Sequence, residues 1–141
     1  MSAAPTAHRL ALVTVSQDEA RVWNAGLDPT MRPESIRPPE HSHVHVRQAQ
    51  RHRGHDRDHD EPGFYDAVAG AVSEAHEILL VGHGNGKANH MLRMVQQWER
   101  RHPAVAARVV GAVVSDLSAM SEREVLATAR DWFDHYHRWG F

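Results

Sequence analysis

Apolar and polar residues alternate in two short stretches near the start of the chain. Residues 8–15 and 20–25 both have the period of two that is typical of β-strands. The four polar residues at 16–19 predict a turn between them, so the two strands are expected to form an antiparallel hairpin. A third short strand is predicted over residues 34–37, where a pair of prolines follows.

Farther along the chain, helical periodicity alternates with continuous apolar runs. The runs at 78–81 and 109–114 predict strands buried on both faces of a parallel sheet. Helices are predicted from about residue 62, from about residue 88 and from residue 121, where Ser121 and Glu124 form a capping-box pattern. The residues expected on the buried helix faces are Phe64, Val68, Ala71, Val72 and Ala75, then Ala88, Met91, Leu92, Val95 and Trp98, then Val125, Leu126, Ala129, Trp132 and Phe133.

This order of elements predicts an α/β fold. Three antiparallel strands come first, and alternating helices and parallel strands follow in one mixed sheet, joined by right-handed crossovers. That is the ribonuclease H-like arrangement. A ribonuclease H nuclease needs carboxylates that converge on the sheet, one of them in the middle of the first strand. Residues 8–15 contain none, so the sequence does not predict nuclease activity.

The composition excludes several classes of protein. The chain has 141 residues, which predicts a single domain over residues 1–141. It has no cysteine, and therefore no disulfide, thiolate metal site or cysteine nucleophile. The net charge is −2, so a uniformly basic surface for nucleic acid is absent. No apolar run is long enough to span a membrane, and we expect a cytoplasmic protein without a membrane partner.

A glycine turn that follows the run at 78–81 is the first candidate site. A strand, a glycine turn and a helix start would direct backbone N–H groups and one ammonium toward a bound anion, such as an RNA phosphate. The turn lacks the hydroxyl residue of a Walker loop and the spacing of the dinucleotide fingerprint, and a tight turn alone would also explain its glycines. The candidate residues are Gly82, His83, Gly84, Asn85, Gly86 and Lys87.

A polar segment at residues 41–60 is the second candidate site. It accounts for much of the histidine content, 13 in the whole chain, and lacks the apolar residues of a core, so we expect a projecting loop. Imidazole groups are suitable ligands for zinc or another divalent transition metal, although the spacing matches no standard site. The candidate metal ligands are His41, His43, His45, His52, His55 and His59.

The same segment carries candidate RNA contacts. Arg47, Arg51 and Arg53 could follow an RNA backbone together with neighbouring histidines. Aspartates at 56, 58 and 60 are interleaved with these groups and offset their charge. The alternatives of RNA binding, metal binding and a solvated loop without either function remain open from the sequence.

Several weak motifs in order resemble a known family. They are the ILLVGHGNGK turn, the RVVGAVVSD strand and the SEREVLATARDWF closing helix. Over residues 8–133 the chain resembles small bacterial translational machinery proteins. These are similar to the middle domain of the eukaryotic and archaeal peptide-chain release factor and to its relative in the ribosome-rescue factor Pelota. The resemblance implies a ribonuclease H-like fold and a link to the ribosome or RNA.

The resemblance does not carry release activity over to this chain. In the release factor, a Gly-Gly-Gln tip lies in the loop that corresponds to residues 41–60, and this chain contains no Gly-Gly-Gln. We therefore expect a non-catalytic adaptor or rescue-type protein that binds the ribosome or tRNA. The alternative is a metal-binding protein or a metal-dependent hydrolase that uses the histidine-rich loop. A homodimer formed through a sheet edge or the aromatic tail is a third hypothesis.

Overall fold

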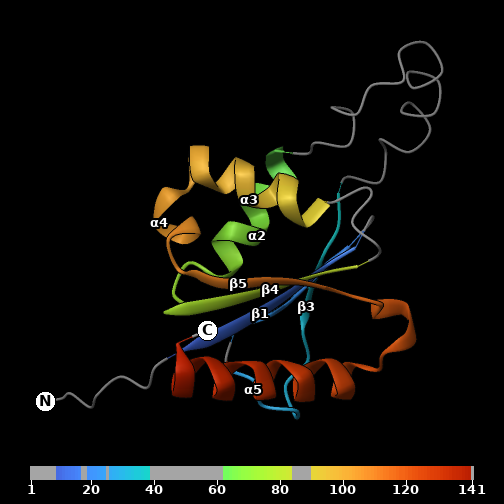
Figure 1. The fold of residues 1–141 in the computed structure, drawn as a ribbon. Helices are drawn as coiled ribbons and strands as arrows, with labels where there is room; N and C mark the ends of the chain where they lie inside the picture. The colour runs from blue at the N-terminus through green and yellow to red at the C-terminus, as the bar shows by residue number, and fades with distance from the viewer. Residues whose placement is uncertain (1–8, 17–18, 25, 39–61, 84–89, 141) are drawn as a thin grey trace, which may run out of the picture.

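The computed structural model describes residues 9–16, 19–24, 26–38, 62–83 and 90–140. These residues form three layers (Figure 1). One mixed sheet lies in the middle, three helices cover one of its faces, and a single long helix covers the other. In the described ranges, no helix is both long and apolar enough to cross a membrane.

The sheet has five strands in the order β3-β2-β1-β4-β5. Pairing is antiparallel between β1 and β2 and between β2 and β3, and parallel between β1 and β4 and between β4 and β5. This confirms the predicted α/β fold of ribonuclease H-like type. The strands are β1 (Leu10–Val15), β2 (Ala20–Trp23), β3 (Glu34–Ile36), β4 (Glu77–His83) and β5 (Val109–Ser115).

The helices occur in the predicted order. Those on the first face are α2 (Pro62–Ala71), α3 (His90–Arg101) and the short α4 (Pro103–Ala106). A 3-10 turn, η2 (Leu117–Ala119), then leads into α5 (Glu122–Trp139) on the other face. Helix α5 begins with the predicted capping box, in which Ser121 accepts from the Glu124 N–H and Glu124 accepts from the Ser121 N–H.

The face covered by α2 and α3 is closely packed around Trp98. This side chain is fully buried, and its Nε1–H donates to the backbone oxygen of Tyr65 over 2.9 Å. Met94 is buried beside it, whereas Leu92 is 50% exposed. The prediction that Leu92 lies on the buried face of α3 is therefore wrong, because Met94 occupies that face instead.

The packing of α5 on the sheet includes one close approach, between Gly111 of β5 and the Trp132 ring of α5. A Cβ atom at Gly111 in β5 would lie 2.3 Å from the Trp132 ring, so only glycine admits this ring against the strand. Trp132 in turn stacks on Tyr136, with ring centroids 5.2 Å apart. Trp139, near the end of α5, is 59% exposed.

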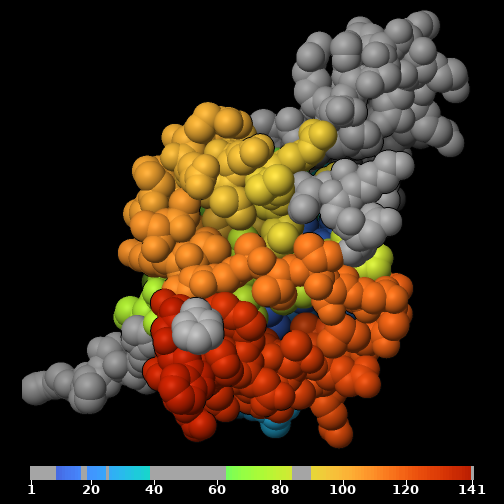
Figure 2. All heavy atoms as spheres, viewed as in Figure 1, coloured from blue at the N-terminus to red at the C-terminus, as the bar shows by residue number. Residues whose placement is uncertain are grey.

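Strand β5 is an edge strand, which corrects the prediction of a strand buried on both faces. Among the described strands, its only partner in the sheet is β4. The alternate residues Ala112 and Val114 are exposed, Val114 to 48%. Figure 2 shows residues of this strand at the surface, in a band between the atoms of α3 and α4 and those of α5.

Candidate functional site

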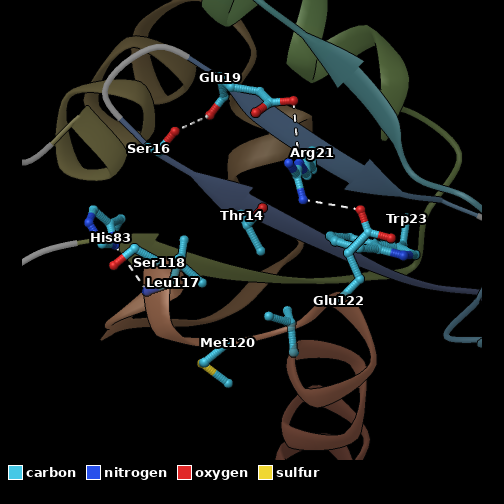
Figure 3. Close-up of a pocket in the computed structure, with 11 residues that line it drawn as sticks. Thr14, Ser16, Glu19, Arg21, Trp23, His83, Leu117, Ser118, Met120 and Glu122 are labelled. Atoms are coloured by element: carbon cyan, nitrogen blue, oxygen red, sulfur yellow. Dashed lines mark hydrogen bonds and ion pairs between the residues drawn. The ribbon is translucent and has the colours of Figure 1, made fainter.

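A polar pocket of about 380 Å³ lies where the parallel strands β1 and β4 end, beside the start of α5 (Figure 3). In folds with parallel strands, the carboxyl ends of the strands are the usual place for a ligand. The residues that line the pocket are Thr14, Ser16, Glu19, Arg21, Trp23, His83, Leu117, Ser118, Met120, Glu122 and Val125.

The strand register explains why the floor of this pocket is polar. Thr14 in β1 is directly opposite Arg21 in β2, and both face α5 because side chains alternate along a strand. The same alternation places Trp23 on that face, next to Leu12 of the apolar core. On the opposite face, Val13 and Val22 pair within the core under α2. In both strands of the hairpin, polar side chains therefore occur only on the face toward α5.

Glu19 anchors one side of the pocket. Its carboxylate accepts hydrogen bonds from Ser35 and from the Arg21 Nε, and Arg37 lies 3.7 Å away. Burial raises the pKa of Glu19, but the hydrogen bonds from Ser35 and Arg21 lower it. The positive charges of the two arginines lower it further, so the pKa lies below its ordinary value of 4.5. Glu19 is therefore ionised at neutral pH and holds Arg21 in place.

Arg21 connects the sheet to α5 across the pocket. Its Nη1 donates to the Glu122 carboxylate over 3.1 Å, and Glu122 is the first residue of α5. Ser121 fixes the start of this helix through the capping box. A guanidinium has five N–H donors, and the Nη2 donors of Arg21 have no partner among the residues that the structure describes. Arg21 can thus donate to a ligand without leaving either glutamate.

Thr14 is the buried polar group at the floor of the pocket. The residue is only 6% exposed, and within the described ranges no hydrogen bond to its hydroxyl is found. The Nε1–H of Trp23, which also lines the pocket, is buried and has no acceptor in the same ranges. The Thr14 hydroxyl therefore offers a donor and an acceptor to any ligand that enters the pocket.

His83 forms the wall at the end of β4. Its Nδ1 accepts a hydrogen bond of 3.0 Å from the Leu117 backbone N–H. A neutral imidazole that accepts at Nδ1 carries its hydrogen on Nε2. His83 is therefore a donor through Nε2, and η2, which contains Leu117, fixes the plane of the ring.

The same contact argues against a Ser-His-Asp hydrolase. The Asp116 carboxylate lies 4.0 Å from His83 Nδ1, but that nitrogen accepts from Leu117 and has no hydrogen to donate to the carboxylate. A triad needs an Nδ1–H donated to the acid. Asp116 instead accepts from Ser118 over 2.8 Å, and the Ser115 hydroxyl is directed to the Met120 sulfur. The described groups thus lack the hydrogen-bond order of that mechanism.

The charges around the pocket oppose a phosphate inside it. Two carboxylates, Glu19 and Glu122, line the cavity with a single guanidinium, Arg21, which is already paired with both. Like charges at these distances are unfavourable. A phosphate contact at this end of the molecule therefore requires other basic groups.

Two residues of the predicted anion site belong to the described structure. His83 lines the pocket, as described above. Gly82 faces the other side of the sheet, where an added Cβ would lie 3.1 Å from Met91, so it has a packing role at the start of α3. The other residues predicted for this turn, Gly84, Asn85, Gly86 and Lys87, lie outside the described residues.

The predicted metal ligands and RNA contacts of segment 41–60 also lie outside the described residues, and they stay predictions. They are His41, His43, His45, His52, His55 and His59 for zinc, and Arg47, Arg51 and Arg53 for RNA. Among the residues with a described position, no group of three or more histidines and carboxylates is placed to hold a metal ion.

Sequence reasoning missed the pocket on the hairpin. The signal was present in the alternation that predicted the strands, since Thr14, Ser16, Arg21 and Trp23 occupy one parity on each side of the turn. The alternation in the strands could not show that Glu122 lines the pocket, because the position of Glu122 depends on how α5 crosses the sheet.

Comparisons with known proteins add to this picture. No protein-family model and no curated protein matches the chain. Among solved structures, the chain is similar to Pelota from the archaeon Archaeoglobus fulgidus, whose crystal structure revealed plasticity between its domains. The match has a TM-score of 0.52 at 13% identity and covers 87% of this chain, but 30% of the Pelota chain. The chain is therefore a mixed α/β domain whose fold is similar to part of Pelota.

Proposed function

We propose that this chain is a translation-associated protein that binds the ribosome or tRNA at the end of the molecule where β1 and β4 finish. The observation that carries the proposal is the Pelota-like fold over most of the chain.

The arrangement of charges supports this end of the molecule as the contact surface. His83, which closes β4, is followed along the chain by the glycine-rich stretch that carries Lys87, the only lysine in the protein. An ammonium beside a glycine turn and a helix start is suited to an RNA phosphate. The carboxylates of the pocket disfavour a phosphate inside the cavity, so we expect the phosphate contact to be made by Lys87 outside it.

The proposed role is binding without catalysis. The chain contains no Gly-Gly-Gln sequence, so it lacks the tip that promotes peptide release in the release factor. The orientation of His83 does not support an acyl-transfer triad. An adaptor or rescue-type factor fits these residues better than a hydrolase.

The test is co-sedimentation with ribosomes at low and moderate salt. Wild-type protein is expected to pellet with ribosomes, and pelleting should fall as salt rises because phosphate contacts release counterions. Lys87→Ala is expected to weaken pelleting and its dependence on salt.

The matched control removes the same charge from the other end of the sheet. Arg32 is exposed in the loop between β2 and β3, and this loop begins where the Gly26 N–H donates to Leu10 at the start of β1. Arg32→Ala is expected to pellet like wild type. Absence of pelleting at any salt, or equal loss in both variants, would contradict the proposal.

A further inference from the structure

The side chains that line the pocket beside His83 differ in polarity from one side of the pocket to the other. Leu117, Met120 and Val125 give apolar surface to the side formed by η2, the following turn and α5, beside the polar Ser118 and Glu122. The wall on the sheet side carries Thr14 and Arg21 instead. A flat ring with apolar faces and a polar edge matches such a cavity, since a methionine sulfur packs well against an aromatic ring.

The polar wall offers both donors and acceptors. Arg21 Nη2 and His83 Nε2 are donors, the half-exposed Glu122 carboxylate is an acceptor, and the Thr14 hydroxyl can be either. In Figure 3 the Thr14 side chain lies between those of His83 and Arg21. A ligand edge on which donors and acceptors lie side by side would satisfy these groups together.

Charge and size narrow the class of ligand. Glu19 and Glu122 disfavour a phosphate or carboxylate. Because Arg21 pairs with both carboxylates and Arg37 also pairs with Glu19, their charge is largely compensated and gives little attraction for a permanent cation. The volume of about 380 Å³ lies within the range of about 300–1,000 Å³ that is usual for small-molecule sites. A neutral heterocycle with a polar edge meets all of these conditions.

We propose that this pocket binds an unstacked nucleobase, with the ring against Met120 and its polar edge toward Thr14, Arg21 and His83. Proteins commonly read single-stranded RNA by capturing such splayed bases. The base is presented either by RNA, which rests on the function proposed above, or by a free nucleoside. In the RNA case, the phosphates remain outside the cavity, because Glu19 and Glu122 line it.

The test is an NMR titration of the full chain with adenosine, guanosine, cytidine and uridine, which carry no phosphate. At least one nucleoside is expected to shift the Trp23 indole N–H, the Leu117 amide and the His83 ring signals. Thr14→Val removes the hydroxyl while keeping the shape of the side chain, and it is expected to weaken that nucleoside about tenfold. Thr128→Val is the matched control, because Thr128 is exposed on α5 and does not line this pocket.

A second variant keeps the test decisive if Thr14→Val does not fold. Glu122 is half-exposed on the first turn of α5, so Glu122→Gln is expected to preserve the fold and still weaken nucleoside binding. Inorganic phosphate and spermidine are the competing probes. Shifts of the pocket signals by either of these, without shifts by any nucleoside, would overturn the proposal.

The outcomes separate this inference from the proposed function. If ribosomes pellet the protein but no nucleoside shifts the pocket signals and Thr14→Val pellets like wild type, the nucleobase pocket is wrong and translation binding stands. If a nucleoside binds and Thr14→Val weakens it while ribosomes do not pellet the protein, the pocket is a free-nucleoside site and the translation role is wrong.

Discussion

The two faces of the sheet differ in the residues that they present: one face forms only packed core, and the other forms core and the candidate site. Under α2 and α3, the central strands β1, β2 and β4 bury apolar residues, such as Val13, Val22 and Leu80, and Trp98 closes the layer. Under α5, the apolar core ends before the strands do, and Thr14 and Arg21 take over at the carboxyl ends. One helix cannot cover five strands as fully as three helices can, and the uncovered end forms the pocket. Successive residues of the same strand point to opposite faces of the sheet. The same strands therefore supply the folding core on one face and the candidate site on the other.

The largest expected effect lies on the closed face. Trp98→Ala removes a fully buried ring and the hydrogen bond from its Nε1 to Tyr65, so we expect a loss of about 3–5 kcal/mol in the free energy of unfolding. Urea denaturation followed by circular dichroism measures this loss. Trp139→Ala, at an exposed tryptophan of α5, should change the stability by less than about 0.5 kcal/mol. Similar losses in both variants would contradict the packing described for α3.

The next effect tests how α5 is seated on the sheet. In Gly111→Ala the new Cβ would overlap the Trp132 ring, so we expect a loss of about 1–3 kcal/mol from overpacking. Trp132→Leu should relieve the clash, and the double variant should be less destabilised than the sum of the single variants. Additive losses in thermal or urea unfolding would show that the ring does not pack on Gly111.

A smaller effect is expected at the start of α5, next to the pocket. Ser121→Ala removes the hydroxyl that accepts from the Glu124 N–H, at a cost of about 1 kcal/mol. Ser73→Ala removes an exposed hydroxyl that has no hydrogen bond among the described residues, so it should be nearly neutral in the same unfolding measurement. Equal effects of the two substitutions would contradict the role of the capping box in positioning Glu122.

A pH dependence follows from Glu19. Its pKa is lower in the folded state than in the unfolded state, so its ionisation contributes stability that is present above pH 4.5 and is lost as the pH falls through the folded-state pKa. Glu19→Gln should therefore destabilise the protein at neutral pH, and the difference from wild type should shrink below pH 4.5. Thermal unfolding from pH 7 to pH 3 measures it. Thr128→Val, which changes an exposed residue of α5 without removing a titratable group, is the control and should show the pH dependence of wild type.

The smallest expected effect on stability is at the pocket itself. Thr14→Val places a methyl group where the hydroxyl has no partner in the described chain, so the free energy of unfolding should stay within about 1 kcal/mol of wild type or rise. A fully hydrogen-bonded buried hydroxyl would instead cost stability when removed. A loss above about 2 kcal/mol in urea denaturation would contradict an unpartnered Thr14.

Most of the fold was predictable because hydrophobic periodicity is local. The strand alternation, the helical segments and the capping box at Ser121 each depend on residues within a few positions, and they agree with the structure. The buried face of α3 was assigned wrongly at Leu92, because Met91, Met94 and Trp98 form that face. Val114 lies in a correctly predicted strand, but its exposure depends on where the sheet ends, which no local pattern records.

The candidate site was predictable only in part for the same reason. His83 was predicted as a site residue because it follows an apolar strand and begins a glycine turn. Thr14 and Arg21 were not, although their alternation with apolar neighbours placed them on one face. The pairing of Arg21 with Glu122 joins residues 101 positions apart and depends on the path of α5. The predicted sites in residues 41–60 and 84–87 remain to be tested by binding experiments.

The most direct test of the difference between the two faces is to map an RNA onto the molecule. A single-stranded RNA of mixed sequence, titrated into the full chain and followed by amide NMR, is expected to shift signals at Thr14, Arg21, His83 and the first turn of α5. Signals around Trp98 on the α3 face and around Arg32 at the opposite end of the sheet should remain in place. Shifts centred on α2 and α3, or on the loop that carries Arg32, would contradict the claim that the α5 side holds the functional site.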